Sequence, residues 1–285
     1  MPHLALSLFF WLVLSGQPPG AAASSAREAY AELPGVRLAY LDTGGSGAAV
    51  VLLHAATGSS RTWEFQIPAF TAAGYRVIAF DRRGFGRTVV TPGGPQPGTG
   101  ADDLHALMDS LKIDRFHLLG TAAGGFVAVD YALSFPRRLR SLVIANSIGG
   151  VQDDDYLALG RRIRPPEFNA LPPDVRELGP SYRAANPEGT RRWLELEHTH
   201  LAGGPPPPAQ TMRNRITFEA VATIQAPTLL LTGGADLYAP PPVMQLFVRR
   251  IKGAESVVVP EAGHSTYWEQ PDAFNRAVLA FLRKH

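Results

Sequence analysis

The sequence contains no cysteine, and this absence excludes several kinds of site and anchor. Without thiols the chain can form no disulfide framework, no cysteine-ligated zinc site and no iron–sulfur cluster. It also lacks a thiol nucleophile and the cysteine that would carry a lipoprotein anchor. The fold must therefore be stabilised by its packed core, and a chain of 285 residues is long enough to bury a large one.

A large excess of charge and a membrane-spanning run are missing as well. The formal net charge is +2, which is too small and too dispersed to indicate a nucleic-acid partner. One apolar run, Leu4–Leu14, has 11 residues with Ser7 as its polar member, whereas a membrane-spanning helix needs about 20 residues. We therefore expect no nucleic-acid partner and no stable membrane anchor.

The run Leu4–Leu14 has the length of the apolar region of a secretory signal peptide. Small residues follow it, and the small-x-small sequences at 21–23 and 24–26 have the form of a cleavage site. We predict a signal peptide over residues 1–26 and a secreted or periplasmic protein. The alternative is a misassigned start codon or a disordered tail, which would leave the protein in the cytoplasm.

The rest of the sequence alternates between short apolar runs and helical patterns. Strands are expected at Val36–Leu41, Ala49–Leu53, Tyr75–Phe80, Arg115–Leu119, Leu139–Ala145, Pro227–Leu231 and Ser256–Val259. Helices are expected at Trp63–Ala73, Ala101–Leu111, Gly124–Leu133, Pro242–Arg250 and Pro271–Arg283. This alternation predicts an α/β fold with a mostly parallel, doubly wound sheet. Val36–Leu41 alternates apolar with polar residues, which is typical of an edge strand.

One stretch, residues 148–226, contains no convincing strand. Its composition turns to arginine, proline, glutamate and aspartate, and residues 203–208 read GGPPPP. We interpret it as a helical cap inserted over one end of the sheet. The core is then divided into a first part at 27–147 and a second part at 227–285.

Four segments at expected strand ends carry residues typical of catalytic chemistry. They are Leu53–Ser59, Gly120–Gly125, Gly233–Asp236 and Ala262–His264. Their order and spacing resemble those of the α/β-hydrolase fold superfamily over about residues 35–282. In that family a G-x-nucleophile-x-G turn joins a strand to a helix, and the acid and the histidine follow along the chain.

The register implied by this resemblance puts Ala122 at the nucleophile position. Gly120 and Gly124 supply the small residues that the sharp turn needs, but a methyl group cannot attack a carbonyl carbon. Thr121 carries the only hydroxyl of the turn. It lies one place early, where the side chain is expected to point away from the pocket.

The other catalytic parts of the family pattern are present. The resemblance implies that His264 is the general base and that Asp236 is the acid that orients it. The backbone N–H groups of Ala123 and Ala56 would form the oxyanion hole. Ala55 stands where family members usually have glycine, so its methyl group is expected to narrow this loop.

Other polar residues have simpler interpretations, and the motifs require no metal and no organic cofactor. His54 is expected to be structural. His198 and His200 are two residues apart, so on a helix they face different sides. Asp153–Asp155 lacks the rest of a calcium loop. The arginines within 161–164 are expected on a solvated face, with one of them able to reach the pocket and select an acidic substrate.

Three functional hypotheses are compatible with Ala122. The leading one is a hydrolase of a small ester, lactone or C–C bond substrate that uses the His264–Asp236 pair and the oxyanion hole, with its usual serine replaced by Ala122 through engineering or in this copy only. The second is a cofactor-free lyase or oxygenase type of enzyme in which the pair acts as a base without a covalent intermediate. The third is a non-catalytic protein that binds a small molecule. Loss of a triad serine lowers turnover on the order of a million-fold, yet retention of the pair favours an enzyme.

Overall fold

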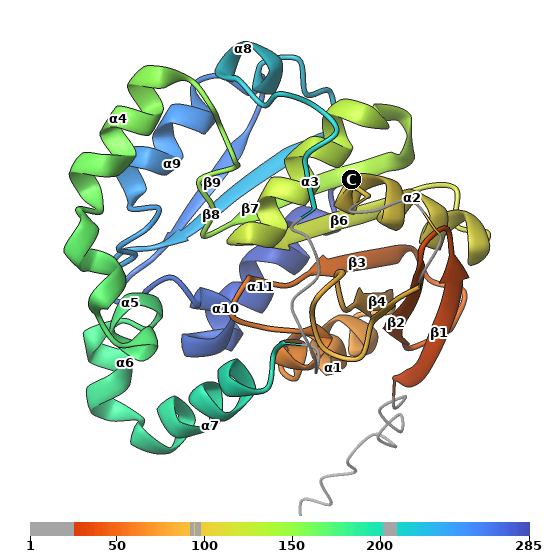
Figure 1. Ribbon diagram of the computed structural model, residues 1–285, viewed down its shortest axis with the longest axis horizontal. Helices are drawn as coiled ribbons and strands as arrows, with labels where there is room; N and C mark the ends of the chain where they lie inside the picture. Colours follow the sequence, from red (N-terminus) through yellow and green to blue (C-terminus); the bar gives the residue numbers. More distant parts are fainter. Residues whose placement is uncertain (1–25, 92–93, 95–97, 202–209) are drawn as a thin grey trace, which may run out of the picture.

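The computed structural model describes residues 26–91, 94, 98–201 and 210–285, so the predicted signal peptide lies outside the described residues except for its last position. A nine-stranded sheet forms the centre of the molecule, in the order β1-β2-β4-β3-β6-β7-β8-β9, with β5 beside β2 (Figure 1). The strands are β1 (Arg27–Leu33), β2 (Val36–Asp42), β3 (Ala49–Leu53), β4 (Arg76–Phe80), β5 (Val89–Val90), β6 (Phe116–Thr121), β7 (Leu139–Ala145), β8 (Thr228–Gly233) and β9 (Glu255–Val259).

Six consecutive strands of the sheet, from β4 through β3, β6, β7 and β8 to β9, pair in parallel. All residues of β3 and β6 are buried, as expected for strands covered on both faces. The predicted mostly parallel α/β sheet is confirmed. Because the strands run the same way, the loops that follow them gather at one edge, where the candidate catalytic motifs lie.

The prediction that Val36–Leu41 forms an edge strand is wrong. Strand β2 pairs with β1 on one side and with β4 on the other, both antiparallel. The edge is β1, which the sequence pattern did not indicate because only Ala31 of its seven residues is buried. Backbone pairing with β2, through a turn in which Gly35 has a φ of 75°, places β1 without much side-chain burial.

Helices cover both faces of the sheet (Figure 1). One face carries α2 (Gly100–Ser110), α3 (Ala123–Ser134), α4 (Asp154–Ile163), α8 (Phe218–Val221) and α9 (Pro241–Val248). The other carries α1 (Gln66–Ala72), α10 (Thr266–Glu269) and α11 (Pro271–Leu282). The helix predicted at Trp63–Ala73 starts later than expected, because a 3₁₀ turn, Ser60–Trp63, precedes α1. Pro68 is tolerated because it lies in the first turn of α1.

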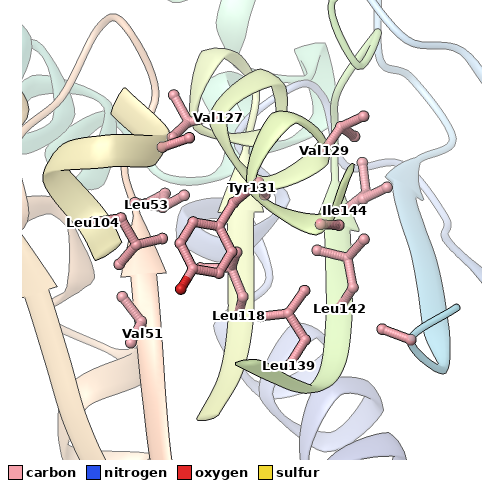
Figure 2. Packing of buried hydrophobic residues seen from close by; sticks show 14 of the residues in the cluster. Val51, Leu53, Leu104, Leu118, Val127, Val129, Tyr131, Leu139, Leu142 and Ile144 are labelled. Carbon is pink, nitrogen blue, oxygen red and sulfur yellow. The ribbon is translucent and has the colours of Figure 1, made fainter. Parts of the chain in front are cut away.

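Two hydrophobic clusters, one on each face, form the core. Val51 and Leu53 of β3 belong to the first cluster, whereas Val50 and Leu52 belong to the second, as the two-residue period of a strand requires. Figure 2 shows the first cluster, in which Val127, Val129 and Tyr131 of α3 lie among side chains of β3, β6 and β7. Helix α3 therefore packs directly on the strands that precede and flank it.

The described part of residues 148–226 contains helices but no named strand. Besides α4 and α8 it holds α5 (Pro173–Glu177), α6 (Pro180–Ala185) and α7 (Pro187–His198), which lie beyond the end of the sheet (Figure 1). Leu178, Trp193 and Leu196 of this stretch join the second core cluster. In the described ranges no helix has the length and apolar character needed to cross a membrane.

Candidate active site

The turn between β6 and α3 is strained at Ala122, which has φ 50° and ψ −118°. A non-glycine residue in such a sparsely populated region costs on the order of 1–3 kcal/mol and persists only where its surroundings fix it. The Ala122 N–H donates to the Ala145 carbonyl at 3.0 Å, and the Ser147 hydroxyl donates to the Ala122 carbonyl at 2.6 Å. Such strain is typical of functional sites, and it lies at the strand-to-helix turn, or elbow, where the family resemblance implies a nucleophile and this chain has a methyl group.

The glycines of the elbow are needed for close approach of the backbone. A Cβ atom on Gly120 would lie 2.4 Å from the Gly124 carbonyl oxygen. A Cβ atom on Gly124 would lie 2.2 Å from the Leu53 carbonyl oxygen. The start of α3 therefore packs directly against the ends of β6 and β3, and the close approach to β6, the strand that precedes the turn, is the one that the sequence predicts. Thr121 is fully buried and does not line the cavity described below.

His264 and Asp236 form a buried pair at the ends of β9 and β8. The His264 Nδ1 atom lies 2.9 Å from both carboxylate oxygens of Asp236, and the two residues are 6% and 3% exposed. Burial alone would lower the pKa of His264, but the adjacent carboxylate raises it above its ordinary value. Because Nδ1 faces Asp236, we assign its proton to that hydrogen bond, which leaves Nε2 as the basic atom.

Four further donors keep Asp236 ionised. Burial would raise the pKa of this carboxyl group, but His264 and the hydrogen bonds from Ala239 and Asn146 lower it below its ordinary value. The donors are the Asn146 side-chain amide at 3.0 Å, the Thr232 hydroxyl at 3.2 Å and the backbone N–H groups of Tyr238 and Ala239 at 2.8 and 2.9 Å. Asp236 is thus a fixed anion that can orient an imidazole and stabilise its charged form.

A cavity of about 350 Å³ lies over the elbow. Its lining includes Ala56, Ala122, Ala123, Arg164, Glu177 and His264. The structure therefore brings together four of the predicted site residues, namely Ala56, Ala122, Ala123 and His264. Asp236 lies behind His264 rather than on the cavity wall, and Gly120 and Gly124 lie within the elbow.

The two nominated oxyanion-hole residues face this cavity. Ala123 is the first residue of α3, so its N–H has no carbonyl partner within the helix and lies at the positive end of the helix dipole. Ala56 lies in the turn that follows β3. His54 stabilises this turn: its Nε2 accepts from the Arg82 N–H at 3.1 Å and its Nδ1 lies 2.7 Å from the Ala55 carbonyl oxygen. Both nitrogens are used, so His54 is structural, as predicted.

Other polar groups singled out in the sequence lie away from the cavity. His198 is on α7, and the His200 ring lies 6.0 Å from that of Phe85. The Asp153 carboxylate accepts the Phe218 N–H at 2.7 Å. Across the described ranges, no group of three or more histidine, aspartate or glutamate residues is arranged to hold a metal ion.

Several residues of the site were not indicated by the sequence. Arg176, Glu177 and Tyr238 line the cavity, and the Tyr238 ring lies 4.3 Å from that of His264. Two of them come from the cap, about 90 residues before His264, where no local motif marks them. Arg164 also lines the cavity and donates to the Tyr238 carbonyl at 2.6 Å, so one arginine within 161–164 does reach the pocket.

Glu269 of α10 is another residue that the sequence did not indicate. Its carboxylate accepts the N–H groups of Gly263 and Ser265, which flank His264, at 2.9 and 3.3 Å. It also accepts the Gly179 N–H of the cap at 2.7 Å. Burial raises the pKa of this carboxyl group to about 7. The Glu269 side chain thus connects the loop that carries His264, residues 260–265, to the cap. We call this segment the histidine loop.

Known proteins are similar to this chain over most of its length. A 2-hydroxy-6-oxononadienedioate/2-hydroxy-6-oxononatrienedioate hydrolase of Burkholderia vietnamiensis is 30% identical over 278 residues, covering 87% of this chain and 92% of the relative. A 2-hydroxy-6-oxo-6-phenylhexa-2,4-dienoate hydrolase of Burkholderia cepacia is 28% identical, covering 85% and 90%. A thermophilic esterase of Thermogutta terrifontis superposes with a TM-score of 0.73 at 29% identity, covering 91% of this chain and 99% of the esterase.

These relatives support an enzyme of the hydrolase type. The model of the alpha/beta hydrolase family matches residues 50–277, which include the elbow, the acid and the histidine. The match spans most of the described chain, and the mostly parallel sheet and the strand–turn–helix motif are those that the family resemblance implies. The chain belongs to the alpha/beta hydrolase family.

Proposed function

We propose that this protein hydrolyses a carbonyl compound, an ester, a lactone or a ketone cleaved at a C–C bond, without forming an acyl-enzyme. The observation that carries the proposal is the intact His264–Asp236 pair, at 2.9 Å, beside an elbow whose side chain is only a methyl group. In place of a serine hydroxyl, a water molecule over Ala122 would be the nucleophile. His264 Nε2 takes a proton from this water as its oxygen attacks the carbonyl carbon.

The oxyanion that forms in this step needs donors that are already in place. Ala123, at the start of α3, and Ala56, in the turn after β3, both line the cavity, and their N–H groups would bind the developing charge. An oxyanion hole and substrate binding alone leave roughly 10³–10⁴-fold acceleration over water in enzymes of this kind that lack their triad. The expected turnover is therefore slow compared with that of a serine hydrolase.

We further propose that the substrate is a small carboxylate. Arg164 and Arg176 both line the cavity, and the relatives from Burkholderia are named for hydrolysis of dioate and dienoate compounds. Guanidinium groups bind carboxylates through paired N–H donors, so these two side chains suit an anionic substrate group. The cavity of about 350 Å³ sets a small size for it.

The test compares the native chain with Ala122→Ser and His264→Ala on monoesters of succinic acid, with intact-mass measurement of the protein during turnover. We expect slow hydrolysis by the native chain with no mass increase, loss of activity in His264→Ala, and a covalent adduct only in Ala122→Ser. Since the base must be neutral, the rate is expected to fall as the pH drops through the raised pKa of His264.

Thr121→Val is the matched control, because it removes the only hydroxyl of the elbow from a buried position whose Oγ1 has no hydrogen-bond partner. Its activity should equal that of the native chain. An acyl adduct on the native protein, or undiminished activity in His264→Ala, would contradict the proposal. If no variant hydrolyses any ester, the base-only and binding hypotheses take its place.

A further inference from the structure

The cap contributes an acidic side chain to the cavity, that of Glu177 at the end of α5. Glu177 is 5% exposed and lines the cavity together with His264 and Tyr238. Its backbone carbonyl accepts the N–H of Ser265 at 3.0 Å, which fixes this part of the cap beside the histidine loop. The carboxyl group is therefore held at the reaction site by a contact that does not involve the carboxyl group itself.

The Glu177 carboxyl group has little to stabilise a negative charge. Its Oε2 atom is enclosed and has no hydrogen-bond partner, and within the described ranges it forms no ion pair. Asp236, by contrast, accepts from four donors besides His264. A buried carboxyl group with an oxygen that has no partner favours its neutral, protonated form more than a fully hydrogen-bonded one does.

The surroundings of Glu177 act in the same direction overall. Burial raises the pKa of its carboxyl group above the ordinary value, and the nearby Asp236 adds to this effect. The charge of His264, a side-chain hydrogen bond with Tyr238 and the charge of Arg176 act in the opposite direction but do not outweigh burial. Two acids in one site thus have environments that push their pKa values apart, which is the arrangement by which enzymes separate an ionised group from a proton donor.

We propose that Glu177 is a catalytic acid that protonates the leaving group, a step that rests on the hydrolysis proposed above. His264 Nε2 takes a proton from water as the water oxygen bonds to the carbonyl carbon. The bond from that carbon to the leaving oxygen then breaks, and the leaving oxygen takes the proton of Glu177. Transfer of the His264 proton to the Glu177 carboxylate, directly or through water, restores both groups. The net reaction is ester and water to acid and alcohol.

A neutral Glu177 also fits the charges that line the cavity. Arg164 and Arg176 line the same cavity as Glu177, and an ionised Glu177 would repel a carboxylate substrate there. When Glu177 is protonated, the two guanidinium groups remain available to bind the carboxylate of the substrate. The anionic substrate and the protonated acid are therefore mutually consistent.

The experiment uses Glu177→Gln, which keeps the size of the side chain but cannot give up a proton. Infrared difference spectra between the native protein and this variant report the protonation of Glu177 without any turnover. We expect the carbonyl-stretch band of a protonated carboxyl group at neutral pH in the native protein. The contribution of Glu269 cancels, because both proteins contain it.

The second readout is hydrolysis of the ethyl and the p-nitrophenyl monoesters of succinic acid. A general acid contributes roughly 10²–10⁴-fold where the leaving group needs a proton, and p-nitrophenolate does not need one. We expect Glu177→Gln to slow the ethyl ester by roughly a hundred-fold or more and the p-nitrophenyl ester by less than about tenfold. Glu167→Gln, at an exposed position of the cap, is the control and should change neither rate.

The outcomes separate this inference from the proposed function. Absence of the protonated-carboxyl band at neutral pH overturns the inference whether or not esters are hydrolysed. Equal losses on the two esters assign Glu177 a structural role and overturn the donor step, while hydrolysis itself stands. No hydrolysis of either ester by the native chain overturns the proposed function and the donor step with it.

Discussion

A single methyl group added at Gly124 would meet backbone on two sides. Its Cβ atom would lie 2.2 Å from the Leu53 carbonyl oxygen and 2.8 Å from that of His54, and neither can move without shifting β3 or the loop after it. Overpacking of this kind costs typically 1–3 kcal/mol. We predict that Gly124→Ala lowers the free energy of unfolding by at least ~2 kcal/mol, measured as the shift of the urea midpoint.

Gly160→Ala provides the control, because Gly160 lies in α4 and an added Cβ atom would meet only the end of the Arg164 side chain at 3.1 Å. Alanine in place of glycine within a helix stabilises by about 0.5–1 kcal/mol. This variant should therefore shift the midpoint upward. If the two substitutions shift it alike, close backbone approach at the elbow is not what requires Gly124.

Among the elements, α10 determines the position of the histidine loop through Glu269. Burial raises the pKa of its carboxyl group from 4.5 to about 7, so between these pH values the folded protein holds a proton that the unfolded chain has released. The stability that this proton provides is fully present below pH 4.5 and is lost as the pH rises through 7. At about 1.4 kcal/mol per pKa unit, the loss is up to ~3 kcal/mol.

We predict that Glu269→Gln removes this dependence. The Tm of the native protein should decline more steeply between pH 5 and pH 8 than that of the variant, as measured by calorimetry in buffers of equal ionic strength. Glu261→Gln removes an exposed carboxylate of the histidine loop and should leave the pH dependence of the Tm as steep as in the native protein. Parallel profiles for the native protein and Glu269→Gln would assign the pH dependence to other groups.

At the scale of the whole molecule, the sequence predicts what depends on local periodicity or on a strand-end motif. The parallel strands, Ala122 and the His264–Asp236 pair belong to this group. Strand β1 was missed because backbone pairing, and not an apolar run, places it. Glu177 and Glu269 were missed because their roles depend on contacts between the cap and the histidine loop, which no local spacing encodes.

These contacts also bear on whether the cap folds on its own. Trp193 of α7 is 1% exposed and packs in the second core cluster with side chains of the sheet, such as Leu231 of β8. Truncating a buried tryptophan to alanine costs about 3–5 kcal/mol. If the cap and the sheet share one hydrophobic cluster, this loss should lower the free energy of unfolding of the whole molecule.

We predict that Trp193→Ala leaves a single unfolding transition, with coincident midpoints by far-ultraviolet circular dichroism and tryptophan fluorescence, but at lower urea concentration. Hydrogen exchange of the most protected amides of β6 should accelerate in proportion to the global loss, although β6 lies outside the cap. Leu157→Ala, at a position of α4 that is 42% exposed, should stay within about 0.5 kcal/mol of the native protein. Two separate transitions, with exchange in β6 unchanged, would instead show that the cap unfolds independently, and the contacts of Glu177 and Glu269 would then be too weak to hold the site together.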